Sequence, residues 1–123
     1  MTDLPGSLEL AYLGDAIYDF YVRERLVRGG DRINVLHKRA IRTVCAHAQA
    51  EALQRVEALL TDEERAVVRR ARNARQTPPR SADPAEYHRA TALEALIGYL
   101  FLTDQKARME TLIASALDAG ERE

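Results

Sequence analysis

Apolar side chains recur at helical spacing along almost the whole of this 123-residue chain. The clearest case is a stripe in the second half of the sequence, at positions i, i+3, i+4, i+7 and i+8: Leu93, Leu96, Ile97, Leu100 and Phe101. Such spacing places the five side chains on one face of a helix. No segment alternates apolar and polar residues as a half-buried strand does. The pattern predicts an all-α domain, with this helix at the centre of its core.

Capping signals divide the chain into five or six expected helices. The expected N-caps are Ser7, Asn34, Thr61, Asp83 and Thr103. Glutamates three residues after Thr61 and Asp83 complete the spacing of a capping box. The helices are expected to end near residues 28, 60, 75, 102 and 120, the second being long and able to bend. Consecutive prolines at 78 and 79 predict an exposed loop over residues 76–81.

Length and composition favour one globular domain spanning residues 1–123. Hydrophobic residues make up 46% and charged residues 30% of the chain, with few glycines and prolines, which excludes disordered and low-complexity classes. The single cysteine, Cys45, excludes a disulfide framework and a clustered-thiolate zinc site, fits a reducing compartment, and is expected to be a small core residue. The longest apolar run, residues 96–102, is far shorter than a membrane span. We expect a cytoplasmic protein without a membrane segment.

A formal net charge of -1 conceals two basic blocks. Residues 65–82 contain six arginines and no acid, and residues 32–50 contain four basic residues and no acid. Blocks of this kind are either solvated helix faces or surfaces that bind a polyanion. The charge pattern alone leaves both interpretations open.

Two acids, Asp15 and Glu94, lie in otherwise apolar helical segments. An isolated carboxylate is costly there unless it is paired or bound to a cation. Each lies near a mid-helix glycine, Gly14 and Gly98, which suggests that the two helices approach closely and bring the acids together. Two carboxylates with water suit Mg²⁺ or Mn²⁺. The alternative is a structural ion pair with Arg23, Arg42 or Arg89, or exposure at the edge of the core.

The surroundings of these acids resemble a known family. The segments LGDA at 13–16 and LEALIG at 93–98 are similar to the two signatures of the ribonuclease III catalytic domain. Intervening segments at 36–40 and 72–74 match in the same order, and the whole chain resembles the compact Mini-ribonuclease III subfamily. The resemblance spans most of residues 8–103 and implies a ribonuclease III-type helical fold.

The resemblance also implies an activity and a site. It implies a Mg²⁺-dependent endoribonuclease, with Mn²⁺ able to substitute, that hydrolyses double-stranded RNA as a homodimer. Asp15 and Glu94 match the family's metal-binding, catalytic acids, whereas Ala11 and Thr91 stand where larger members carry further acids. A smaller ligand set leaves the number of ions per centre open. Maturation of precursor ribosomal RNA of the large subunit is a further implication of the resemblance.

The family normally appends a double-stranded-RNA-binding domain, for which this length leaves no room. Binding of the duplex is therefore expected to fall to cations of the catalytic domain. The first candidates are Arg69, Arg70, Arg72, Arg75 and Arg80, with the loop 76–81 entering a groove. The secondary candidates are Lys38, Arg39 and Arg42, although His37, Lys38 and Arg39 could instead stabilise the fold near the active site.

Two other function classes compete with the nuclease. One is a non-catalytic helical module that binds RNA or acts as a scaffold on the same fold. The other is an unrelated all-α, metal-dependent nucleotide hydrolase, which usually carries denser acidic motifs in its core helices than this chain does. The nuclease is distinguished from the scaffold by cleavage of duplex RNA. A nuclease should require a divalent ion, Asp15 and Glu94 for this cleavage.

Overall fold

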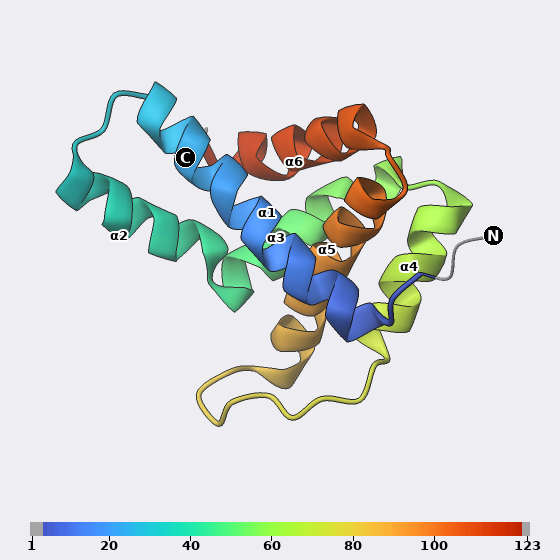
Figure 1. Ribbon diagram of the computed structural model, residues 1–123. Coiled ribbons are helices and arrows are strands. Elements are labelled where there is room, and N and C mark those ends of the chain that lie inside the picture. The colour runs from blue at the N-terminus through green and yellow to red at the C-terminus, as the bar shows by residue number, and fades with distance from the viewer. Residues whose placement is uncertain (1–3, 122–123) are drawn as a thin grey trace.

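The computed structural model describes residues 4–121 (Figure 1). This part of the chain contains α-helices, one short 3₁₀ helix and no strand. The elements are α1 (Ser7–Arg28), α2 (Ile33–Val44), α3 (Ala46–Val56), η1 (Glu57–Leu59), α4 (Asp62–Arg72), α5 (Pro84–Leu102) and α6 (Lys106–Glu121). The all-α prediction is confirmed.

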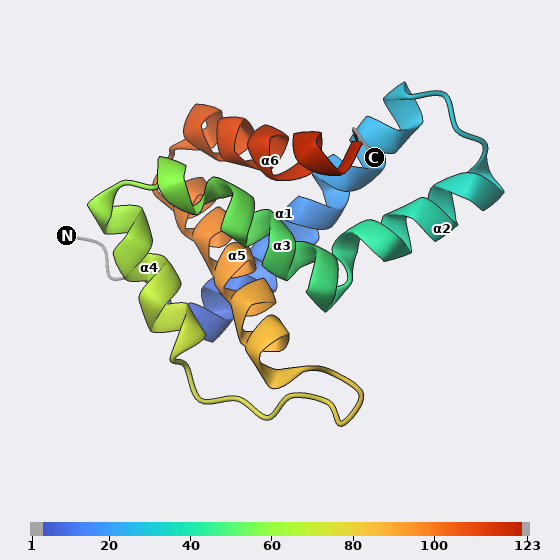
Figure 2. The ribbon, with the colours of Figure 1, turned by 180° about the vertical axis from the view of Figure 1, so that it is seen from behind.

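Helix α5 forms the centre of the fold, as its apolar stripe predicts. It packs against α1, α3, α4 and α6, and Figures 1 and 2 show it surrounded by them. Leu93, Leu96, Ile97 and Leu100 are all buried. Phe101, in the last turn of α5, is 45% exposed, so its expected place in the core was wrong.

The capping signals are confirmed in part. Thr61 and Glu64 form the expected capping box at the start of α4. The side chain of Asp83 accepts a hydrogen bond from the backbone N–H of Glu86 at 3.1 Å, which caps α5. The carboxylate of Glu86 does not close a second box, because it pairs with His47 of α3 instead. That pair joins the start of α3 to the start of α5.

Other expected helix ends differ by a few residues. Gly6 is the N-cap of α1, and Ser7 is its first helical residue. At the end of α1 only Gly30 takes the left-handed conformation, with φ +87°. Thr103 follows α5 as its C-cap and does not begin the last helix, which starts at Lys106.

The long helix expected from Asn34 to about residue 60 is two helices. Cys45 has extended backbone, with φ -69° and ψ 158°, so α2 ends at Val44 and α3 begins at Ala46. Cys45 is exposed, which contradicts its expected place in the core. Because of this break α3 packs against α5 while α2 extends away from it as an arm, with Ala40 as its one buried described residue.

The predicted loop is present between α4 and α5. Residues 75–79 have no regular secondary structure, and the loop extends from one end of the molecule (Figure 2). Within residues 4–121 no helix combines the length and apolar character that crossing a membrane requires.

Candidate active site

Two glycines allow α1 and α5 to cross in backbone contact. A Cβ atom added to Gly14 would lie 1.7 Å from the backbone oxygen of Glu94. A Cβ added to Gly98 would lie 2.1 Å from the backbone oxygen of Leu10. Any side chain at either position would therefore collide with backbone that cannot easily move. The close approach expected from the two mid-helix glycines is confirmed.

The crossing brings the side chains of Asp15 and Glu94 together. Asp15 is exposed on α1, whereas Glu94 is mostly buried on α5. Burial, and after it a hydrogen bond with Asp15 and the negative charge of Asp15, raise the pKa of Glu94 from 4.5 to about 8. A hydrogen bond from Gln49 opposes this rise of the Glu94 pKa. The site is thus a carboxyl pair at the edge of the core, open to solvent on the Asp15 side.

The described residues do not form the structural ion pair that was the alternative role for Asp15 and Glu94. Within residues 4–121 no ion pair links Asp15 or Glu94 to a lysine or arginine. Arg23, one of the expected partners, pairs with Asp19 at 3.0 Å on the outer side of α1. The negative charge of the carboxyl pair is therefore not compensated by an arginine or lysine of this part of the chain.

The donor chemistry of the pair fits a hard divalent cation. Carboxylate oxygens are preferred ligands of Mg²⁺ and Mn²⁺, and Mg²⁺ commonly keeps several waters beside one or two carboxylates. Among the described residues no group of three or more His, Cys, Asp or Glu side chains could hold a metal. Asp15 and Glu94 could supply two carboxylate ligands to such a cation, with water filling the remaining positions. A bound cation would also favour ionised Glu94, which burial and Asp15 disfavour.

The raised pKa of Glu94 predicts how stability depends on pH when divalent ions are removed. Between pH 4.5 and about 8 the folded state binds more protons at Glu94 than the unfolded state does. Stability should therefore fall as pH rises through this window, by at most about 1.4 kcal/mol per pH unit. Urea unfolding with a chelator at several pH values measures this slope. Glu94→Gln should flatten it, and an unchanged slope in that variant would contradict the assignment.

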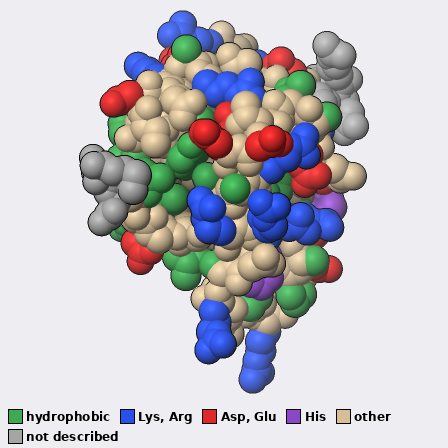
Figure 3. Space-filling model, turned by 90° about the vertical axis from the view of Figure 1, so that its right-hand side faces the viewer, with side chains coloured by type: hydrophobic (Ala, Val, Ile, Leu, Met, Phe, Trp, Pro, Cys, Tyr) green, Lys and Arg blue, Asp and Glu red, His purple; other side chains and the backbone are tan. Residues whose placement is uncertain are grey.

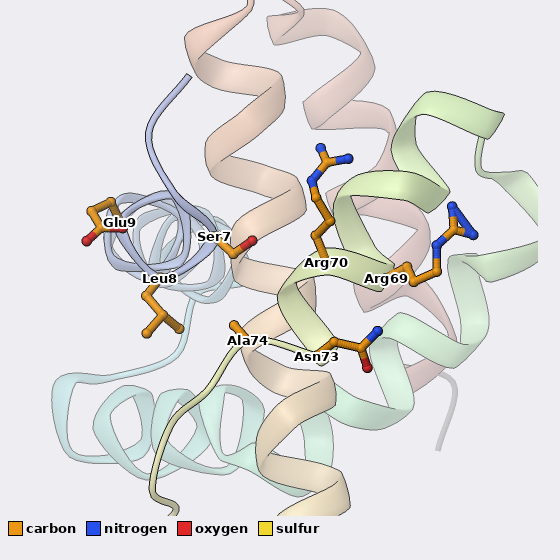
Figure 4. A pocket seen from close by; sticks show the side chains of 7 residues that line it. All are labelled: Ser7, Leu8, Glu9, Arg69, Arg70, Asn73 and Ala74. Carbon is orange, nitrogen blue, oxygen red and sulfur yellow. The ribbon is translucent and has the colours of Figure 1, made fainter. Parts of the chain in front are cut away.

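The five candidate arginines are all exposed. Arg69 and Arg70, at the end of α4, line a surface hollow together with Ser7, Leu8 and Glu9 of α1 (Figure 4). In Figure 4 the Arg69 and Arg70 side chains extend outward from α4. Ser7 precedes Asp15 by eight residues, which is about 12 Å along a helix axis. The hollow at the end of α4 thus lies about two helical turns of α1 away from Asp15.

The basic residues of α2 have a different arrangement. Arg39 pairs with Asp31, in the connection between α1 and α2, and Lys38 is exposed. Helices α2 and α4 lie on opposite sides of α1 (Figure 1), so the structure does not join these residues to the α4 arginines within one chain. Figure 3, which views the side of the molecule where α4 lies, shows Lys and Arg side chains on this face and at the end where the α4–α5 loop lies.

One residue of the site was missed by sequence reasoning. Gln49 of α3 is only 3% exposed, and its side chain hydrogen-bonds to Glu94. A signal was available, because Gln49, Leu53 and Val56 follow helical spacing i, i+4, i+7, which places a polar side chain on an apolar face. The site therefore combines side chains from α1, α3 and α5.

Comparisons with known proteins agree with this arrangement. The model of the Ribonuclease III domain matches residues 8–105. A Mini-ribonuclease 3 of Symbiobacterium thermophilum is 51% identical, covering 94% of this chain and 90% of its own. A Mini-ribonuclease 3 of Enterococcus faecalis is 48% identical, covering 88% of this chain and 85% of its own.

A solved structure extends the likeness to the fold. The crystal structure of a protein from Fusobacterium nucleatum superposes with a TM-score of 0.85 and 34% sequence identity. The match covers 92% of this chain and 93% of that one. Both signature segments, the carboxyl pair that they bring together and the arrangement of helices agree with one assignment. The chain belongs to the ribonuclease III family, in its Mini-ribonuclease III branch.

Proposed function

We propose that this chain, acting as one catalytic domain, is an endoribonuclease that hydrolyses phosphodiester bonds of double-stranded RNA with Mg²⁺. Maturation of precursor large-subunit ribosomal RNA in the cytoplasm is the cellular role that we propose for it. The observation that carries the proposal is the convergence of Asp15 and Glu94, about eighty positions apart in sequence, with no lysine or arginine of the described chain paired to them. The membership of the family supports the same reaction class.

Each residue of the site has its own role in this proposed reaction. Asp15 and Glu94 would hold the cation at the open edge of the α1–α5 crossing, where a phosphate can reach it. When bound, Mg²⁺ supplies positive charge at the phosphate and lowers the pKa of water. Gln49 donates a hydrogen bond to Glu94 and is neutral, so it leaves the charge of the pair for the cation. The arginines of α4 and the following loop bind phosphates on either side of the cleaved bond.

The reaction is tested with labelled RNA and purified protein. Duplex RNA should be cut when Mg²⁺ is present and remain intact with a chelator, and single-stranded RNA of the same sequence should be cut far more slowly. Precursor ribosomal RNA serves as the second substrate. Binding of the duplex without cleavage in the presence of Mg²⁺ would instead favour a scaffold module on the same fold.

The role of the arginines predicts a change in salt dependence. Arg72→Ala and Arg75→Ala should each weaken duplex binding and reduce the slope of log affinity against log salt concentration by roughly one unit. Both side chains are exposed, so the fold should be unaffected. Arg28→Ala, at the far end of α1 and also exposed, is the matched control and should leave the slope unchanged. Unchanged slopes in Arg72→Ala and Arg75→Ala would remove these residues from the RNA interface.

The exposed face of α1 supports a homodimer. Tyr12 is 85% exposed and Phe20 is 60% exposed, and together with Leu8 they span an arc of about 120° on the surface of α1. Large apolar side chains that are exposed on one side of a helix are typical of protein interfaces. A dimer through this face would carry two carboxyl pairs and so could cut both strands of a duplex.

The dimer is tested by sedimentation. Tyr12→Asp should convert a dimer to a monomer, because it places a charge in the apolar interface. Leu59→Asp, on η1 and 49% exposed, is the control and should leave the dimer intact. A wild-type protein that sediments as a monomer at micromolar concentration would overturn this part of the proposal.

A further inference from the structure

Gln49 is an exception among the buried polar side chains of the described residues. These are Gln49, Glu64 and Thr91. Glu64 closes the α4 capping box and accepts a hydrogen bond from Arg108 at 3.0 Å, and Thr91 donates to the backbone oxygen of Tyr87 at 3.1 Å. Both therefore have local structural partners. Gln49 instead reaches from α3 to a carboxylate of the candidate active site on α5.

Burying an amide is costly unless its hydrogen-bonding groups find partners. Helix α3 packs against α5 and carries Gln49 on the same face as Leu53 and Val56, both of which are completely buried. An apolar side chain at position 49 would continue that face without the cost of burying an amide. The position instead holds a donor that contacts Glu94, which indicates that the hydrogen bond serves the site and not the packing of α3.

The chemistry of an amide suits this position. A lysine or arginine beside Glu94 would neutralise the carboxylate and compete with a cation. The amide N–H of Gln49 fixes the carboxylate without adding charge, so the full negative charge remains available. Partners of this kind, which orient a metal ligand from behind, commonly contribute to metal affinity. Glu94 is then held from α3 by Gln49 while it faces Asp15 of α1.

We propose that Gln49 is a positioning residue, which holds the carboxylate of Glu94 in the orientation that binds a divalent cation together with Asp15. This inference rests on the proposed function, because it assumes that the carboxyl pair binds such an ion. It assigns to α3 a part in the site that neither signature segment contains.

The test measures Mn²⁺ affinity in the absence of RNA, by electron paramagnetic resonance or calorimetry. Gln49→Met keeps the volume of the side chain and removes the donor, and it should weaken Mn²⁺ binding by roughly 10- to 100-fold. Leu53→Ala, one turn further along α3, is the matched control. It removes buried volume from the same helix and should leave Mn²⁺ affinity unchanged, which separates a local effect on Glu94 from a general loss of packing.

A second variant allows the test to be carried out if Gln49→Met does not fold. If Gln49→Met does not fold by circular dichroism, Gln49→Asn keeps the amide but shortens it by one methylene, and it should weaken Mn²⁺ binding in the same direction. Wild-type affinity in a folded Gln49 variant would overturn the role of Gln49 and leave the proposed function intact. A wild-type protein that binds no Mn²⁺ would overturn the proposed function, and the role of Gln49 with it.

Discussion

Asp15→Asn and Glu94→Gln are each expected to slow cleavage of duplex RNA by roughly 10³-fold or more at saturating substrate. Each substitution keeps the shape of the side chain and removes one of the two charges that would hold the cation. Binding of the duplex should persist, because the exposed arginines of α4 and its loop are unchanged. Single-turnover cleavage and a filter-binding assay, carried out on the same preparations, separate the two effects.

Asp19→Asn is the matched control for this prediction. Asp19 lies one turn after Asp15 on the same helix, but it pairs with Arg23 at 3.0 Å and takes no part in the carboxyl pair. Loss of the Asp19 charge should change the rate of cleavage by less than about threefold, since exposed ion pairs contribute little to stability. Cleavage that survives in both Asp15→Asn and Glu94→Gln would refute the assigned site, whatever the control shows.

Substitution of the crossing glycines should have the largest effect on stability. Gly14→Ala and Gly98→Ala each add a Cβ within about 2 Å of a backbone oxygen of the facing helix, at 1.7 Å and 2.1 Å respectively. Relief requires α1 and α5 to separate along a buried contact, so each change should cost more than about 3 kcal/mol of the free energy of unfolding. Thermal unfolding followed by circular dichroism measures the loss.

Gly29→Ala provides the comparison at a glycine with room for a side chain. Gly29 has φ -74°, and a Cβ there would lie 3.3 Å from the oxygen of Leu26, a much milder contact. We expect a change within about 1 kcal/mol of wild type, of either sign. If Gly14→Ala is tolerated as well as Gly29→Ala, then the two helices do not cross as closely as the site requires.

The parts of the fold that local chemistry determines could be predicted from the sequence. The stripe on α5 identified the central helix, and the Thr61 capping box identified the start of α4, because both depend on residues a few positions apart. Gly14 and Gly98 also indicated a contact between helices that are distant in sequence. A mid-helix glycine is unfavourable relative to alanine unless such a contact requires it. The carboxyl pair followed from that crossing.

The features that depend on tertiary contacts could not be predicted in this way. The break at Cys45 has no proline or glycine to signal it, so helical periodicity continued across it. Glu86 has the spacing of a capping box, yet a histidine from α3 takes its carboxylate. The spacing of Gln49 could have indicated its place on an apolar face, but its role could not be predicted, because Glu94 lies beside it only in the folded chain.

Diffraction from crystals grown with Mn²⁺ tests the central claim most directly. The anomalous signal of the ion locates it without reference to activity. We predict a peak between the carboxylates of Asp15 and Glu94, absent from crystals of the Glu94→Gln variant. A protein that cleaves duplex RNA while Mn²⁺ occupies some other position, or with the two carboxylates turned apart, would contradict the account.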